Sequence, residues 1–129
     1  MARMKDTAHP DVVSYPDLRA LPFESRRPGY ARALLHRDRG SRALVLRLQP
    51  GGRVPAHRHS SVLDLFIGLE GAIEIGWSGK RMKIQPGGVC RIPPGVRHEV
   101  FNPSAGQDAY CVLLHAGPGP FDFVQEDHE

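Results

Sequence analysis

The stretch GGRVPAHRHSSVLDLFIGLEG, residues 51–71, combines strand-forming residues with side chains that can bind a metal ion. Alternate side chains of an extended strand share a face, so His57 and His59 are expected to point the same way. Asp64 interrupts an apolar run, and the residues two positions away on either side of it are apolar. A buried carboxylate is costly unless it is paired or bound to a cation. The stretch therefore predicts β-structure with two imidazoles and one carboxylate on an inner face.

Short apolar runs separated by turn residues continue on both sides of this stretch. The 129 residues include 14 glycines and 12 prolines, and no segment keeps a helical period over three turns. Glu70 and Gly71 are predicted to form a tight hairpin turn. The pattern predicts an all-β fold, a barrel or double-sheet jelly roll. The expected strands lie within residues 30–38, 41–49, 50–59, 62–69, 72–77, 81–84, 89–92, 98–102 and 109–116.

The amino-terminal segment, residues 1–28, differs in composition from the rest of the chain. It is polar and has prolines at positions 10, 16, 22 and 28, which break helices and are confined to strand edges. We expect an extended arm there, followed by a single barrel domain over residues 29–129. One domain is also what this chain length favours.

The composition argues against several classes of protein. The net charge is +3 with a pI of about 9.2, and the arginines are dispersed without interleaved aromatic residues, so we expect no nucleic-acid partner. No apolar run could span a bilayer and no signal peptide is recognisable, so we expect a cytoplasmic protein without a membrane partner. The two cysteines, Cys90 and Cys111, lie in strand-like segments and are expected to be buried free thiols.

A third candidate imidazole follows a rigid turn. His98 comes directly after IPPGVR, residues 92–97, whose prolines and glycine fix the turn that orients it. The remaining histidines, which have no partner at ligand spacing, are His9, His36, His115 and His128. Of these, only His115, on the last expected strand, could approach the pocket.

Two spaced motifs carry a family resemblance. The pattern G-x5-H-x-H-x4-D-x6-G of residues 51–71 resembles the first motif of the cupin superfamily, with Asp where that family usually has Glu. The pattern G-x5-P-x-G-x2-H-x3-N of residues 87–102 resembles its second motif at every named position. Fifteen residues separate the two, a short spacing that is similar to that of compact bacterial cupins. The resemblance implies a single-domain cupin barrel.

The resemblance also implies a metal held by His57, His59, His98 and Asp64. Neutral imidazoles and a carboxylate suit a divalent Fe, Mn, Ni, Zn or Co ion. Aspartate is one methylene shorter than glutamate, so its oxygen falls short by roughly 1.5 Å if the backbone does not move. Either the strand or the metal shifts, or a water bridges the gap, or three histidines hold the metal and leave positions open.

Cupins include dioxygenases, decarboxylases, isomerases and lyases, so the resemblance implies a metal-dependent enzyme acting on a small organic molecule. Dioxygenase-like chemistry is the single class we expect first, with Asp64 as ligand or nearby base. The alternative is a non-catalytic module that binds a sugar or signal and keeps a structural metal. A metal-free barrel is a third interpretation.

Charge is distributed unevenly along the chain. Residues 1–58 carry 12 of the 17 Lys and Arg residues but only 5 of the 14 Asp and Glu residues. A basic arm could therefore lie against the acidic tail QEDHE, residues 125–129, of its own or of a second subunit. Together with the proline-marked arm, this asymmetry leads us to expect a homodimer.

Overall fold

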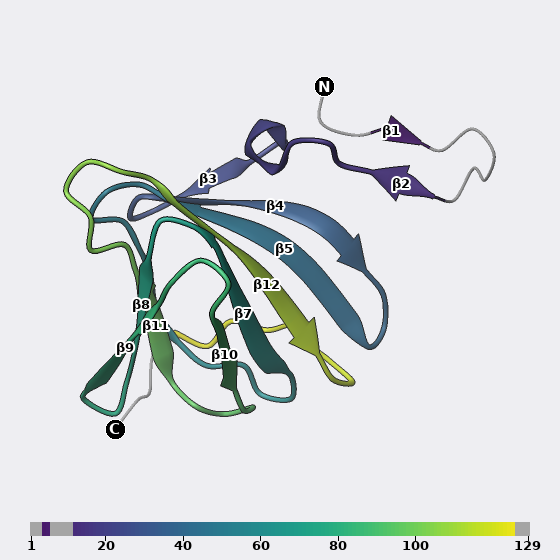
Figure 1. The fold of residues 1–129 in the computed structure, drawn as a ribbon. Coiled ribbons are helices and arrows are strands. Elements are labelled where there is room, and N and C mark those ends of the chain that lie inside the picture. Colours follow the sequence, from purple (N-terminus) through teal and green to yellow (C-terminus); the bar gives the residue numbers. More distant parts are fainter. Residues whose placement is uncertain (1–3, 6–11, 126–129) are drawn as a thin grey trace.

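The computed structural model describes residues 4–5 and 12–125 of the chain, and these residues form an almost entirely β structure (Figure 1). A single turn of 3-10 helix, η1 (Leu18–Ala20), lies among the strands. The strands are β1 (Met4–Lys5), β2 (Val13–Ser14), β3 (Glu24–Arg26), β4 (Tyr30–Arg37), β5 (Ser41–Leu48), β6 (Arg53–His57), β7 (Leu63–Glu70), β8 (Ile73–Trp77), β9 (Lys80–Ile84), β10 (Val89–Ile92), β11 (His98–Phe101) and β12 (Ala109–Ala116).

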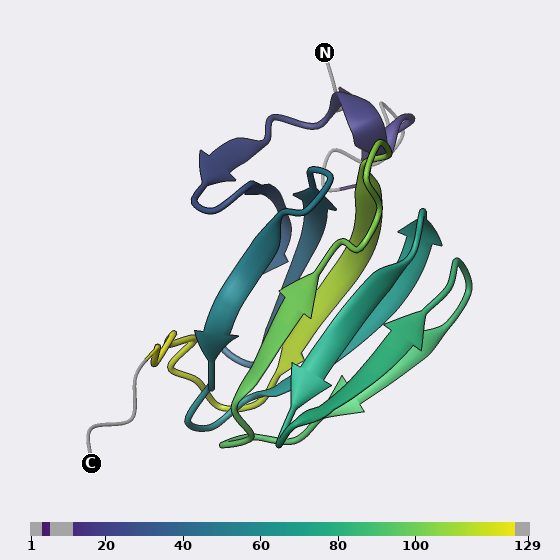
Figure 2. The ribbon, with the colours of Figure 1, turned by 90° about the vertical axis from the view of Figure 1, so that its left-hand side faces the viewer.

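Two antiparallel sheets face each other as the layers of a jelly roll, as Figure 2 shows from the side. One sheet has the order β10-β7-β12-β5-β4-β3 and the other the order β6-β11-β8-β9. A small ribbon of β1 and β2 precedes them. The nine strands expected from the apolar runs coincide with β4 to β12, so the predicted all-β class and jelly-roll architecture are confirmed.

The turn at Glu70 and Gly71 does not close a hairpin, contrary to the prediction. β7 pairs with β10 and β12, whereas β8 pairs with β9 and β11 in the other sheet. The turn therefore carries the chain from one layer to the other. The alternation of apolar residues identifies strands and their buried faces, but it does not say which strands pair.

The main core fills the space between the two sheets. Alternating residues of each strand point inward, and five apolar side chains at such inward positions are buried. They are Phe66, Ile73, Ile75, Val100 and Leu113. Cys90 and Cys111 are free and buried as well, as predicted.

A second apolar cluster lies on the other face of the six-stranded sheet. Leu21 and its neighbours Leu18 and Phe23 pack there against Val45 and Tyr110. β3 adds an edge strand beside β4. Residues 12–28 thus pack along the sheet, and the predicted boundary between arm and barrel stays a prediction, as does the homodimer.

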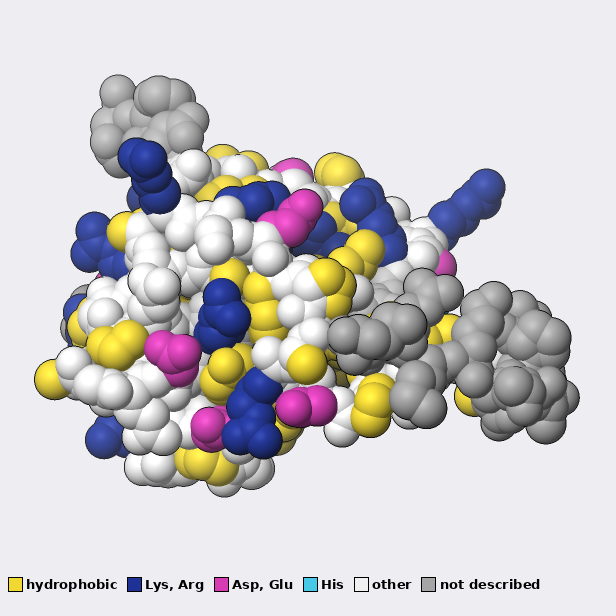
Figure 3. All heavy atoms as spheres, turned by 90° about the horizontal axis from the view of Figure 1, so that it is seen from above, with side chains coloured by type: hydrophobic (Ala, Val, Ile, Leu, Met, Phe, Trp, Pro, Cys, Tyr) yellow, Lys and Arg dark blue, Asp and Glu magenta, His cyan; other side chains and the backbone are white. Residues whose placement is uncertain are grey.

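The described surface mixes charges of both signs. Seen from above in Figure 3, cationic and anionic side chains are interspersed with apolar ones, and no described histidine is visible on this face. Within residues 4–5 and 12–125, no helix has the length and apolar character needed to cross a bilayer.

Candidate metal centre

Four side chains from three strands and one loop meet inside the barrel. His57 ends β6, His59 follows it, Asp64 lies on β7, and His98 begins β11 opposite His57 in the strand register. Each side chain is at most 4% exposed. One potential ligand atom from each residue lies within 4.8 Å of the others. The structure therefore brings together all four residues that the sequence singled out.

Backbone carbonyls determine which nitrogen of the three histidines carries the proton. The Nδ1 atoms of His57 and His98 lie 2.7 Å and 2.9 Å from the carbonyl oxygens of Pro55 and Val96. His59 makes the same contact with the carbonyl oxygen of Asp122. A carbonyl oxygen can only accept, so each Nδ1 must donate, and in a neutral ring the lone pair is then on Nε2. This is the tautomer in which a histidine binds a metal through Nε2.

A fourth histidine, His115 on β12, has the opposite tautomer. Arg42 Nε donates to His115 Nδ1 at 3.1 Å, so the proton of the neutral ring is on Nε2. That Nε2 lies 3.0 Å from Asp64 Oδ1, to which it can donate. His115 is therefore suited to holding the carboxylate in place, whereas His57, His59 and His98 are suited to binding a cation.

The arrangement leaves buried acceptors facing one another. Nε2 of His98 lies 2.8 Å from Asp64 Oδ2, and Nε2 of His59 lies 3.4 Å from Asp64 Oδ1. Neither nitrogen and neither carboxylate oxygen has a hydrogen-bond partner of good geometry among the described residues. Buried polar atoms without partners are rare in native proteins, and a cation between these lone pairs would satisfy them.

The electrostatics of the cluster favour the protonation states of Asp64 and His57 that bind a metal, a carboxylate and a neutral imidazole. Burial opposes ionisation of Asp64, but its contacts with His115, His59 and His98 outweigh burial and hold the carboxyl pKa well below its usual range. Burial and the neighbouring His98 lower the pKa of His57 to about 3, so this ring stays neutral at physiological pH. Asp64 is therefore held as a carboxylate and His57 as a neutral imidazole, whereas at His59 the Asp64 carboxylate outweighs burial and raises the pKa.

These donors fit a divalent transition metal. Three imidazole nitrogens and one carboxylate oxygen bind such an ion at about 2.0–2.2 Å each, which places neighbouring donors roughly 3–4 Å apart. The four donor atoms in the structure all lie within 4.8 Å of one another, close enough to share one ion after small side-chain shifts. The shorter side chain of Asp64 nevertheless reaches the cluster, because its oxygens lie within 2.8 and 3.4 Å of the two histidine nitrogens.

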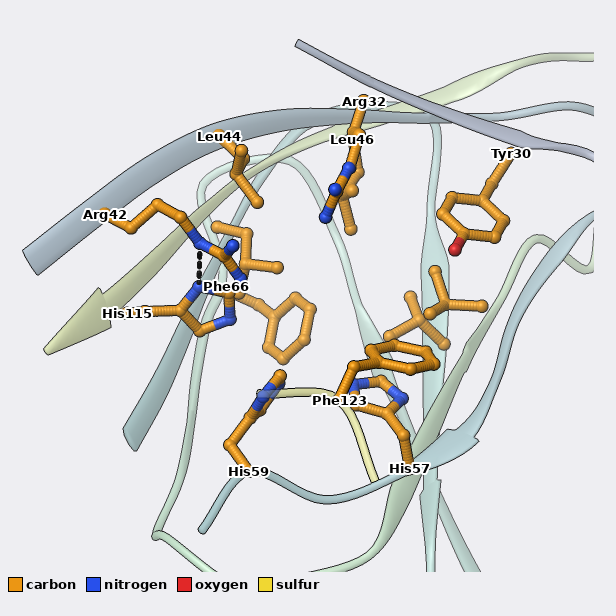
Figure 4. Close-up of a pocket in the computed structure, with 13 residues that line it drawn as sticks. Tyr30, Arg32, Arg42, Leu44, Leu46, His57, His59, Phe66, His115 and Phe123 are labelled. Atoms are coloured by element: carbon orange, nitrogen blue, oxygen red, sulfur yellow. Dashed lines mark hydrogen bonds between the residues drawn. The ribbon is translucent and has the colours of Figure 1, made fainter. Parts of the chain in front are cut away.

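The segment after β12 closes one end of the barrel beside the cluster. Arg58 and Val124 exchange two backbone hydrogen bonds, and both the backbone amide and the hydroxyl of Ser60 donate to the Asp122 carboxylate. The Phe123 ring stacks on His57 with 4.1 Å between centroids and 17° between planes. Figure 4 shows Phe123 beside His57 at the wall of a cavity of about 30 Å³.

The sequence interpretation missed three contributors to this site. The sequence places His115 near the pocket but assigns it no role, although on β12 it shares a face with the buried residues Cys111 and Leu113 and lies opposite Asp64 in the register. Strand parity could have found it. Asp122 and Phe123 had no signal in the sequence, because they come from a segment without a strand pattern.

Comparison with known proteins agrees with the fold. The chain resembles KdgF from Halomonas sp. with a TM-score of 0.70 and 17% identity, over 83% of this chain and 94% of that one. The cupin domain of Schizosaccharomyces pombe Cnp3 gives a TM-score of 0.74 at 17% identity, covering 91% and 88% of the two chains. An oxalate oxidase in complex with the substrate analogue glycolate gives 0.69 at 22% identity, covering 84% and 60%.

Sequence comparison identifies the family. No curated protein matches the chain. The family model described as a cupin domain matches residues 44–115, which extend from β5 to β12 and include all four residues of the cluster. Both motifs, the two-sheet barrel and the convergent histidines are consistent with this match. The chain belongs to the cupin family.

Proposed function

We propose that this cupin is a metal-dependent enzyme acting on a small organic molecule. The observation that carries the proposal is that the buried Nε2 atoms of His59 and His98 and the Asp64 carboxylate make no well-aligned hydrogen bond among the described residues and converge on one point with His57. A bound divalent ion would supply Lewis-acid or redox chemistry there.

The chain's own residues have distinct roles in this proposal. His57, His59 and His98 hold the ion through Nε2, and their carbonyl partners fix the ring orientations. Asp64 is either the fourth ligand or a base beside the ion, and in both cases His115 Nε2 lies 3.0 Å from its Oδ1 and can orient it. Glu74 and Glu99 both pair with Arg81 on the opposite face of their sheet, so they are not available as acid or base in the cavity.

The similar structures support an enzyme without specifying its reaction. The oxalate oxidase shows that a chain of this fold can carry an oxidase activity, at an identity that speaks for the fold alone. Among the reactions implied by the motifs, dioxygenase-like chemistry is our first proposal, since three histidines, with or without the carboxylate, leave positions on an octahedral ion open for O₂ and substrate.

The size of the cavity favours a second candidate function. The space beside the cluster is small, about 30 Å³, and has room for only a few water molecules. A metal in so tight a site could be structural, in a module that binds a small ligand without converting it.

Metal analysis combined with turnover tests the two functions. The purified protein is analysed for metal identity and content, and O₂ uptake is then followed with a panel of small thiols, diketones and phenols. Bound iron with substrate-triggered O₂ consumption that is lost in His98→Gln supports the enzyme. One equivalent of zinc without turnover supports the binding module, and a protein that cannot retain any divalent metal contradicts both.

A further inference from the structure

We propose that the barrel binds a small organic carboxylate, whose charged group is held by the guanidinium groups of Arg32 and Arg42 beside the metal centre. This inference rests on the proposed function, because it assigns a chemical class to the substrate or ligand of the same site. None of the residues carrying it belongs to the metal-binding motifs.

Two arginines from neighbouring strands reach the wall of the cavity. Arg32 on β4 and Arg42 on β5 line it together with His57, His59 and His115. In Figure 4 the guanidinium of Arg32 lies between Arg42 and Tyr30 and points toward the space above the histidines. An anion bound there would lie next to the metal centre.

The positive charge of these arginines is not neutralised by the side chains that the structure describes. Among the described residues, no carboxylate lies within ion-pair distance of Arg32 or Arg42. Glu24 is opposite Arg32 in the strand register, but its carboxylate lies 3.2 Å from Arg26 instead. Asp64 is already in contact with three histidines. Partly buried cations without a counter-ion predict that the site receives one from a ligand.

Arg42 has capacity left for such a ligand. Its Nε donates to His115, and its guanidinium lies over the ring of Phe121 at 5.1 Å from the centroid. The terminal nitrogens make no hydrogen bond to any described residue. Burial and the neighbouring cations Arg32 and Arg37 lower the pKa of Arg42, which shows how closely positive charge is gathered here.

A wider groove outside the cavity is also lined by positively charged side chains. It has a volume of about 400 Å³ and shares Arg32, Arg42, Tyr30 and Phe123 with the inner space. Arginines Arg26 and Arg27 also line it, and within residues 12–125 no acidic side chain contributes to its lining. A groove with walls of one sign raises the local concentration of oppositely charged ligands.

The chemistry of the walls favours a carboxylate on an organic body. A planar guanidinium can bind a carboxylate through two parallel hydrogen bonds. The remaining wall is apolar, with Leu44, Leu46 and Phe66, and suits a carbon skeleton better than a hydrated inorganic ion.

Calorimetric titration with malonate tests the inference on zinc-loaded and metal-free protein. Malonamide, which is neutral and of similar shape, and inorganic phosphate are titrated in parallel. We expect malonate to bind, and Arg32→Met to weaken its binding about 10- to 100-fold, the range for a lost charged hydrogen-bond pair. Arg32→Lys keeps the charge but not the planar fork, so its affinity for malonate should lie between those of the wild-type protein and Arg32→Met. Arg91→Met, an exposed arginine on β10, is the matched control and should not change binding.

The outcomes separate this inference from the proposed function. Arg32-dependent malonate binding to a protein that retains no metal would support the carboxylate site and refute the metal centre. If the protein retains zinc but Arg32→Met binds malonate as tightly as the wild type, the metal centre is supported and the carboxylate site is refuted. Equal binding of malonamide would overturn the inference, as would phosphate binding at least as tightly as malonate. Thermal melting of each variant shows whether a loss reflects unfolding, and Arg32→Lys then provides the folded comparison.

Discussion

At the scale of single residues, the position of one proton separates a metal ligand from a supporting residue. His57, His59 and His98 donate through Nδ1 to backbone carbonyls and so present Nε2 lone pairs. In His115 the Nδ1 accepts from Arg42, so its Nε2 is a donor toward Asp64. Four histidines within one cluster thus divide into two chemical roles.

Replacement of His115 tests this division. His115→Gln should keep the four proposed ligands but release the Asp64 carboxylate from its donor, and we expect metal affinity to fall by about 10- to 100-fold, as for other residues that orient ligands. Competition with a chromogenic chelator measures the affinity. His36→Gln, an exposed histidine on β4, is the control and should leave it unchanged. Complete loss of metal in folded His115→Gln would show that His115 is itself a ligand.

The pH dependence of metal binding follows from the same protons. Burial disfavours the charged form of His59, but Asp64 outweighs this and raises the His59 pKa, so in the metal-free protein His59 gains a proton at a higher pH than a free imidazole. A metal must displace that proton, so metal affinity rises with pH and falls as the pH drops. We expect the metal to be released below about pH 6. Dialysis at a series of pH values, with metal analysis of the retained protein, measures this release. Full retention at pH 4 would contradict the histidine ligands.

The sequence could reveal the proposed ligands because spacing and strand parity are local properties. His57 and His59 share a face by alternation, and Asp64 stands out in an apolar run. His115 is 51 positions from Asp64, and its role depends on β12 pairing with β7, which local patterns do not encode. The tautomers depend on carbonyl groups whose positions only the folded chain defines.

At the scale of elements, glycine turns connect the two sheets and place the strands. Gly51 and Gly71 both have positive φ, at 72° and 67°. They differ in their surroundings. A β-carbon at Gly71 would lie 2.9 Å from the carbonyl oxygen of Asp108, whereas one at Gly51 would have no atom within 4 Å.

This difference predicts unequal costs for the same substitution. Gly51→Ala should lower the free energy of unfolding by about 1–2 kcal/mol, because alanine disfavours the left-handed conformation. Gly71→Ala has the same backbone cost and adds a clash with backbone that cannot move freely, for a further ~1–3 kcal/mol. Urea denaturation of both variants measures the two values. Equal destabilisation would mean that the turn at residue 71 can relax.

Asn102 joins three loop segments at one end of the barrel. Its buried side-chain amide donates toward the carbonyl oxygens of Leu48, Gln49 and Gln107 at 2.8–3.1 Å, and its oxygen accepts from the backbone of Ser104. This explains structurally why the second motif ends in Asn rather than in a residue of the metal cluster.

Removal of the Asn102 amide should therefore destabilise the fold rather than the site. Asn102→Ala leaves buried carbonyl groups without a donor, and we expect a loss of about 2–4 kcal/mol in the free energy of unfolding. The control is Gln85→Ala at an exposed turn position, with little expected change. An unchanged urea midpoint for Asn102→Ala would show that water replaces the amide.

At the scale of the whole molecule, two sheets and the segment after β12 together enclose the site. The nine strands and their buried faces could be predicted because the period of two is written in the sequence. The passage of the chain from one sheet to the other at Glu70 and Gly71 could not be predicted, because the sequence of a tight turn is the same whether or not its flanking strands pair. The closing segment had no pattern at all, yet it supplies Asp122 and Phe123 to the cluster.

The metal content and metal position of the purified protein test the central claim most directly. Elemental analysis, together with anomalous diffraction from crystals of the same preparation, gives both. The account predicts one divalent transition metal per chain, bound by His57, His59 and His98 through Nε2 with Asp64 at the same ion. A folded protein that binds no such metal at neutral pH, or binds it away from these nitrogens, would contradict it.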